Sequence, residues 1–137
     1  MKRLLVLSLM IFLVSACSSY KALDSVREDL HNYVKEYNDL VRQNEFEKAK
    51  LLTNESVREE FDMRAQAARN VKVVDYHILS TDYQTEKGEE IVSVRFDYST
   101  PSGMLKSVVD EQLWSFVYVK SDQRKRWRLM TPLPEFK

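Results

Sequence analysis

Two hydrophobic periods follow one another along the chain, and the change falls close to residue 70. Between Val26 and Val41 the apolar residues recur at steps of three and four, which places them on one face of an amphipathic helix ending near Gln43. From Val71 onward apolar and polar residues alternate, as they do in a strand with one buried face. Helical segments followed by strand segments are typical of an α+β fold.

Start signals divide the helical half of the chain into three. In residues 25–28, 44–47 and 56–59, a Ser or Asn suited to the N-cap position is followed three residues later by Glu, as in a capping box. We therefore predict three N-terminal helices that begin at these capping residues. Asn70 suits the end of the last one.

Turn residues divide the second half into four strands. Gly88 and Gly103 lie in two of the turns, where glycine allows a positive φ. The third strand is the longest, and its apolar residues change from one parity to both, which predicts a bulge or a bend. We expect a curled four-strand antiparallel sheet with the helices on its concave face. The predicted strands cover residues 71–84, 90–99, 104–120 and 124–130.

This order resembles the nuclear transport factor 2-like superfamily, in which a curled sheet wraps around a long first helix. Residues 44–52, with an aromatic, a small and a leucine position, resemble the family's second helix. Trp127-Arg128-Leu129 resembles its closing strand. The resemblance spans about Asp24 to Leu133 and implies one domain. Family members include enzymes such as ketosteroid isomerase and polyketide cyclases, and also non-catalytic binding or scaffold domains, so the fold alone does not choose a function.

The N-terminus has the layout of a secretory signal. A positive start, Met1-Lys2-Arg3, is followed by the apolar run Leu4 to Val14 and then by small residues. The run is shorter than the ~20 residues that a transmembrane helix needs. Val14-Ser15-Ala16-Cys17 resembles the bacterial lipoprotein signal, the lipobox. The resemblance implies that Cys17 becomes the first mature residue and carries lipid. Cys17 as a structural thiol is the alternative, although it is the only cysteine and so cannot form an intrachain disulfide.

The lipobox resemblance sets the domain organisation and the location that we expect. We predict a signal peptide over residues 1–16, a lipidated tether over 17–23 and the folded domain over 24–137. The tether after Cys17 spans at most about 20 Å, which would hold the domain close to the bilayer. Ser18 stands where an Asp usually retains lipoproteins at the inner membrane, and this resembles lipoproteins sorted to the outer membrane, facing the periplasm.

Composition excludes several classes of function. Lys and Arg together equal Asp and Glu at 21 each, and removal of Lys2 and Arg3 leaves a small net negative charge, so nucleic acid is not an expected partner. The two histidines are far apart, and no Gly-rich phosphate loop or zinc-binding helix signature occurs. We expect no metal and no cofactor.

Catalytic residues of this superfamily would lie between the helix and the sheet, as a base and an oxyanion-stabilising hydroxyl. The candidates for such an enzyme are Tyr33, Tyr37, His77, Asp97 and Asp110. None of their spacings singles out a pair, and both tyrosines lie on the apolar stripe of the first helix, where core packing explains them. We expect no enzymatic activity.

An apolar pocket and a basic hairpin are the remaining candidates. Aromatic residues could line a pocket for an apolar ligand, although core packing is the default explanation. These candidates are Tyr33, Tyr37, Phe61, Phe96, Trp114 and Phe116. The basic residues Arg124, Lys125, Arg126 and Arg128 suit lipid phosphates or a solvated hairpin.

The sequence therefore predicts a membrane-anchored envelope lipoprotein with a non-catalytic binding or protein-interaction module. Its partners would be the membrane, through the lipid, and a protein partner or a second copy through the sheet face. Two alternatives stay open: a binder of a small apolar ligand between sheet and helix, and an isomerase- or cyclase-like enzyme.

Overall fold

The computed structural model describes residues 25–84 and 86–137. They belong to two compact units, Met1–Val34 and Lys35–Lys137. In the first unit, residues 25–34 are helical, with Leu30 and Val34 buried. Residues 35–42 of the second unit are helical as well. The predicted signal peptide and lipidated tether lie outside the described residues.

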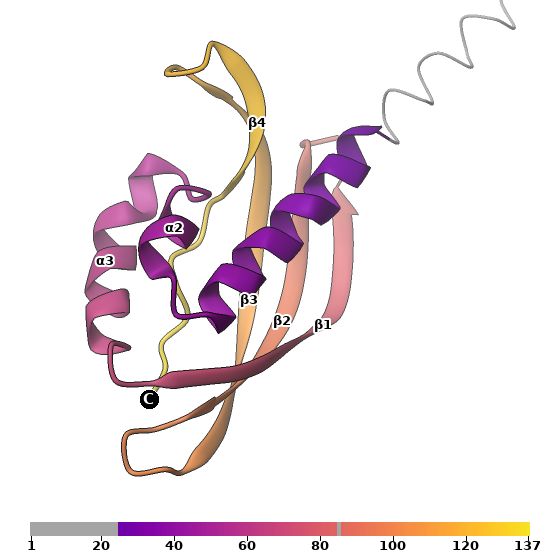
Figure 1. Ribbon diagram of the computed structural model, residues 1–137. Coiled ribbons are helices and arrows are strands. Elements are labelled where there is room, and N and C mark those ends of the chain that lie inside the picture. Colours follow the sequence, from indigo (N-terminus) through magenta and orange to yellow (C-terminus); the bar gives the residue numbers. More distant parts are fainter. Residues whose placement is uncertain (1–24, 85) are drawn as a thin grey trace, which may run out of the picture. The chain divides into compact units, whose positions relative to one another are not determined.

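The second unit is an α+β fold built on a four-strand antiparallel sheet with the strand order β1-β2-β3-β4 (Figure 1). Each strand pairs with the next one along the chain, which confirms the predicted antiparallel sheet. Gly88 and Gly103 have φ values of 61° and 83°, as their predicted places in turns require. The strands are β1 (Lys72–Gln84), β2 (Glu89–Ser99), β3 (Leu105–Val119) and β4 (Arg124–Leu129).

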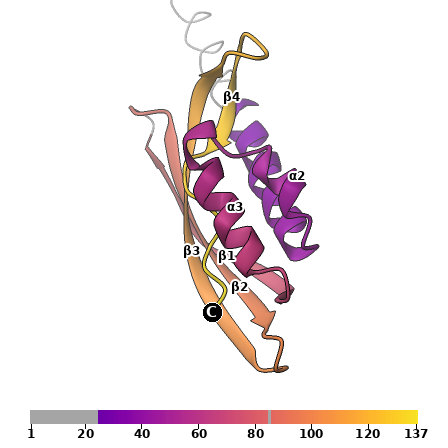
Figure 2. The same ribbon diagram turned by 90° about the vertical axis from the view of Figure 1, so that its left-hand side faces the viewer.

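Short helices lie between residue 42 and the sheet. They are α2 (Phe46–Lys50), the 3₁₀ turn η1 (Glu55–Val57) and α3 (Arg58–Ala67). Figure 2 shows α2 and α3 on the same side of the sheet. We call this side the helix-side face and the opposite side the outer face. Opposite pairs such as Val94–Asp110 and Phe96–Val108 point to the helix-side face, whereas Arg95–Val109 points to the outer face.

Two of the predicted helix starts are wrong in detail. Asn44 has a left-handed φ of 58°, so it follows the end of the first helix, and the N-cap of α2 is Glu45. The Asn44 side chain instead donates to the carbonyl of Val71 at 2.7 Å. Asn54, and not Ser56, is the N-cap of η1, because its side chain accepts from the Ser56 amide at 3.0 Å. A short polar side chain suits several cap and turn positions, so the sequence did not fix which one each would take.

The bulge predicted in the third strand is also wrong. β2 and β3 run in continuous register from Glu89–Ser115 to Ser99–Leu105. The register shifts lie in β1 instead, one between Val73 and Asp75 and the other between Ile78 and Ser80. Each shift inserts one residue and so exchanges the two faces of β1 beyond it.

The chain beyond β4 packs back onto β2. Leu133 and Phe136 are buried, and the Phe136 ring lies 5.9 Å from the Phe96 ring and 5.1 Å from the Tyr98 ring. The Tyr98 hydroxyl donates to the backbone carbonyl of Lys137 at 2.6 Å. The C-terminal segment therefore closes part of the core under the sheet.

Candidate functional site

Four of the predicted pocket residues have no exposed surface. Tyr37, Phe61, Phe96 and Trp114 are each 0% exposed, and the Tyr37 and Trp114 rings meet edge to face at 5.9 Å. Phe116 is half-buried. Neither cavity described below is lined by these side chains, so the apolar pocket stays a prediction.

Tyr33 belongs to the first unit, where it is half-buried. Its predicted part in the pocket stays a prediction as well.

A buried polar cluster lies on the helix-side face of β3. Asp110 is 7% exposed, and Gln112, Asn38 and Trp114 are fully buried. The Gln112 amide nitrogen donates to the Asp110 carboxylate at 3.0 Å and to the Asn38 side-chain oxygen at 2.8 Å. The Gln112 oxygen accepts from the Trp114 indole at 3.2 Å. Gln112 is therefore the hub that satisfies its buried neighbours.

Burial sets the protonation of this cluster. Desolvation raises the pKa of Asp110 to about 7, and the Gln112 hydrogen bond and the Arg64 charge offset only part of that effect. Burial also raises the pKa of Tyr37 well above its ordinary value, and the nearby Asp110 charge adds to it. A carboxyl group that titrates near neutral pH has the pKa that a general base needs.

The Tyr37 hydroxyl is buried and has no hydrogen-bond partner within the described part of the chain. Because an unsatisfied buried hydroxyl destabilises the fold, Tyr37→Phe is expected to raise the free energy of unfolding by about 1 kcal/mol. Tyr98→Phe, which removes a hydroxyl bonded to Lys137, should instead lower it by about 1 kcal/mol. Urea unfolding of both variants checks the pair. If both variants lose the same free energy of unfolding, the Tyr37 hydroxyl has a hydrogen-bond partner.

His77 and Asp97 lie away from this cluster, on the outer face of the sheet. His77 Nε2 is 3.6 Å from Asp97 Oδ2, and Asp97 also pairs with Arg95 at 3.3 Å. The Ser107 hydroxyl and the Arg95 charge lower the pKa of Asp97. Of the five catalytic candidates, Tyr37 and Asp110 are both buried under the sheet, while His77 and Asp97 lie close together on the outer face.

Gln112 and Asn38 were not among the predicted site residues. Their signal was present, because Gln112 has the same parity on β3 as Asp110 and Trp114, and Asn38 follows Tyr37 directly. Polar residues between apolar ones on a buried face predict a buried hydrogen-bond network.

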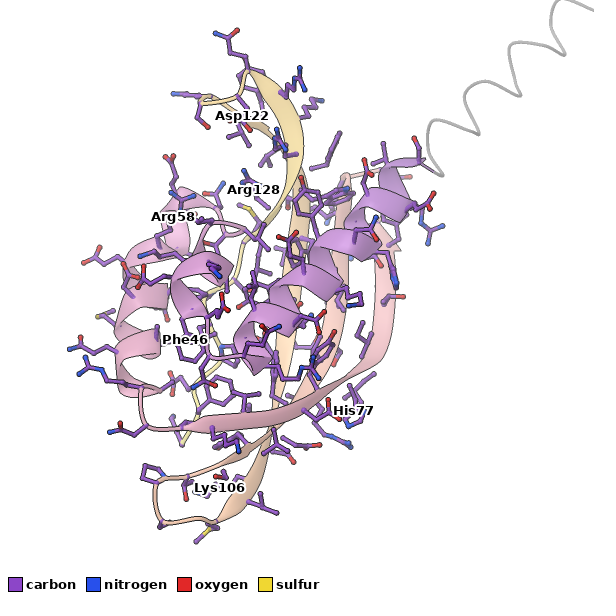
Figure 3. The ribbon with its side chains drawn as sticks, in the orientation of Figure 1. Phe46, Arg58, His77, Lys106, Asp122 and Arg128 are labelled. Carbon is purple, nitrogen blue, oxygen red and sulfur yellow. The ribbon has the colours of Figure 1, made fainter. Side chains whose placement is uncertain are left out.

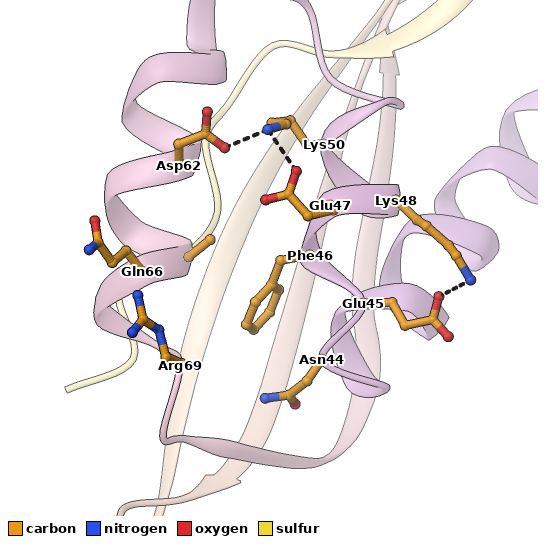
Figure 4. Close-up of a pocket in the computed structure, with 10 residues that line it drawn as sticks. Asn44, Glu45, Phe46, Glu47, Lys48, Lys50, Asp62, Gln66 and Arg69 are labelled. Atoms are coloured by element: carbon orange, nitrogen blue, oxygen red, sulfur yellow. Dashed lines mark hydrogen bonds and ion pairs between the residues drawn. The ribbon is translucent and has the colours of Figure 1, made fainter.

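A cavity of about 600 Å³ lies between α2 and α3 (Figure 4). Phe46 forms part of its wall, but its polar lining consists mainly of charged groups. Lys50 bridges Glu47 at 2.9 Å and Asp62 at 2.8 Å. Because these charges already compensate one another, the cavity suits neither an apolar ligand nor a strongly charged one.

A second cavity of about 390 Å³ lies beside the basic hairpin. Arg58, at the start of α3, and Arg128, on β4, both line it (Figure 3), together with Lys120 and Glu55. Arg126 of the hairpin pairs with Asp122 at 2.6 Å. Part of the predicted basic patch is therefore compensated within the hairpin itself.

Two properties of the described residues bear on function. Within residues 25–84 and 86–137, no helix combines the length and the hydrophobicity needed to cross a bilayer. In the same part of the chain, His, Cys, Asp and Glu side chains form no group of three or more that could hold a metal ion.

Comparison with known proteins gives little beyond the architecture. No family model and no curated protein matches the chain. It is similar in structure to a SEC-C motif containing protein from Psychrobacter arcticus, with a TM-score of 0.59 and 12% sequence identity. The match covers 79% of this chain and 62% of that protein, so the chain spans about three fifths of its length. The likeness shows the fold alone.

Proposed function

We propose that this chain is a lipid-anchored protein of the bacterial envelope, in which a nuclear transport factor 2-like domain serves as a non-catalytic binding or protein-interaction module. The observation that carries the proposal is the order of residues at the N-terminus. A charged start, an apolar run and small residues lead directly to Cys17. The absence of Asp at position 18 favours the outer membrane, with the domain facing the periplasm.

The fold assignment rests on how the second unit is packed. Its helical residues 35–42 contact β3 through the Tyr37–Trp114 rings and the Asn38–Gln112 hydrogen bonds. A helix held against an antiparallel sheet in this way supports a nuclear transport factor 2-like arrangement.

The interior supports a non-catalytic role. The side chains that would line a ligand cavity under the sheet, such as Tyr37 and Trp114, pack against each other without exposed surface. The two cavities lie elsewhere, and charged side chains form part of the lining of both. Binding through the surface of the domain is therefore favoured over binding inside it.

The anchor is tested by the intact mass of the native protein after detergent extraction. We expect a chain that begins at Cys17 and carries acyl groups. A chain that retains Met1 to Ala16, or one without acyl mass, would remove the anchor from the proposal. Proteins that co-purify with the extracted chain, identified by mass spectrometry, test the interaction role.

An isomerase- or cyclase-like enzyme is the second candidate, and one observation favours it. Asp110 and Tyr37 lie together under the sheet, as a base and a hydroxyl would in an enzyme of this superfamily. Turnover of a ketosteroid or polyketide-like substrate by the wild type, lost in Asp110→Asn, would establish this candidate.

The basic hairpin is expected to strengthen contact with an anionic bilayer. Arg124 and Lys125 are exposed, and each cation close to the surface contributes about 1 kcal/mol. The double variant Arg124→Glu/Lys125→Glu of the acyl-free chain should bind phosphatidylglycerol vesicles at least tenfold more weakly in a sedimentation assay. Arg69→Glu with Lys72→Glu, also exposed, makes the same change in net charge away from the hairpin and serves as the control. Equal binding of wild type and the hairpin variant would exclude this contact.

A further inference from the structure

The edge of the sheet at β3 is uncovered along most of its length. β4 pairs only with residues from Trp114 to Val119 of β3. The preceding part of β3, residues 105–112, pairs with β2 on one side and has no strand on the other within the described residues. We call this segment the β3 edge.

The backbone of the β3 edge is free to accept another strand. The Leu113 carbonyl accepts from the Met130 amide at 2.7 Å, so the backbone groups of Leu113 point away from β2. Backbone groups alternate in direction along a strand, and those of Ser107, Val109 and Glu111 therefore point to the same open side. Within the described part of the chain these three residues form no backbone hydrogen bond on that side.

The β3 edge lacks two of the features that usually prevent strand pairing, a β-bulge and a proline. Its register against β2 is continuous, whereas the opposite edge of the sheet, β1, contains two register shifts. It contains no proline. Leu105 is 75% and Val109 53% exposed on the outer face, so apolar surface borders the open backbone.

We propose that the β3 edge pairs antiparallel with the β3 edge of a second copy of this chain, with Val109 opposite Val109. This pairing would join two four-strand sheets into one continuous sheet. It names a partner for the interaction module proposed above and rests on that role, but it does not depend on the lipid anchor.

The sequence of the β3 edge fits itself in this register. A two-fold axis perpendicular to the sheet at Val109 places Val109 opposite Val109 of the second copy and Ser107 opposite Glu111. The two valine side chains then meet on the outer face, and no like charges are opposite one another. A register centred on Val108 would instead place Leu105 opposite Glu111, so the Val109-centred register is favoured.

Cysteine cross-linking of the full-length chain in its membranes tests the pairing. The outward backbone groups of Val109 make Val109–Val109 a hydrogen-bonded pair, with a Cα separation of about 5.5 Å that a disulfide can span. Mild oxidation of Val109→Cys is therefore expected to convert most of the chain into a dimer that reductant reverses. The wild type, which has Cys17 alone, gives the background.

Two matched variants separate specific pairing from random collision. Leu105→Cys lies on the same edge and is more exposed, but the two Leu105 positions would be about 27 Å apart, eight residues along paired strands. Asp82→Cys is exposed on the β1 edge. Both should give background cross-linking, whereas the double variant Ser107→Cys/Glu111→Cys, whose positions face each other in this register, should form dimers.

Adding Val109→Lys to that double variant places two like charges opposite each other and should reduce the dimer at least tenfold. If Val109→Cys cross-links no more than Leu105→Cys or Asp82→Cys, or only to a different protein, the pairing of two copies is overturned. Acylation of Cys17 is measured separately in the same membranes. Dimers without acylation would remove the anchor alone, and acylation without dimers would remove the β3 pairing alone.

Discussion

Replacing Cys17 with alanine is expected to abolish incorporation of labelled fatty acid and to move the chain out of the membrane fraction. The thiol is the only cysteine of the chain, so no second residue offers the same attachment chemistry. Each buried CH₂ contributes about 0.8 kcal/mol, and a second acyl chain converts marginal membrane binding into stable anchoring. Nearly all of the Cys17→Ala chain should therefore leave the membrane fraction.

Ser18→Ala is the matched control, because it changes the neighbouring residue and keeps the thiol. It should incorporate label like the wild type. A chain expressed from Ser18 onward should remain in the aqueous phase of a detergent phase separation. Label on the Cys17→Ala chain, or its absence from the wild type, would contradict the lipidation of this residue.

The alternation of apolar and polar residues was sufficient to predict the sheet. Val92, Val94, Phe96 and Tyr98 alternate without interruption, and β2 has the predicted faces. The faces of β1 were harder to predict, because the residue types do not indicate where its two register shifts lie. Val73 shares its face with Tyr76, three residues later, although simple alternation assigns them to opposite faces. Bulges depend on how neighbouring strands fit together, which one strand's sequence does not record.

The candidate site was predicted only in part, for a related reason. Tyr37 and Asp110 were among the catalytic candidates, but so were residues of the outer face such as His77. Near the end of β3, odd and even positions both carry apolar residues, such as Leu113 and Trp114. The sequence pattern therefore did not show which face of the strand is buried. Once that face is known, Gln112 follows as the partner of Asp110, and its hydrogen bonds show why two polar residues are tolerated there.

Asparagine at position 110 is expected to stabilise the domain at pH 8 and to leave its stability almost unchanged at pH 4. Burial raises the pKa of Asp110 from 3.8 to about 7 in the folded chain. The folded chain therefore holds this proton more tightly than the unfolded chain does. The stabilisation from the protonated group is fully present below pH 4 and is lost as the pH rises through 7.

The gap between the two pKa values corresponds to about 4 kcal/mol. Asp110→Asn keeps an oxygen that can accept the Gln112 hydrogen bond and removes the titrating proton, so the variant should avoid most of this loss. The measurement is the difference in the free energy of unfolding between variant and wild type, taken in urea at several pH values between 4 and 8. Other titrating groups are common to both chains and cancel in the difference.

Asp97→Asn is a control of opposite sign. The pKa of Asp97 is lowered by the Ser107 hydroxyl and by Arg95, so its stabilising contribution is present above the unfolded pKa and is lost as the pH falls. Asp97→Asn should therefore be less stable than the wild type at pH 8, where Asp110→Asn is more stable. If the two variants respond alike, or if Asp110→Asn loses stability at pH 8, the Asp110 carboxylate is held in its ionised form. A buried, ionised carboxylate would need a cation or a donor beyond Gln112, and that result would move the search for a ligand to the interior of the domain.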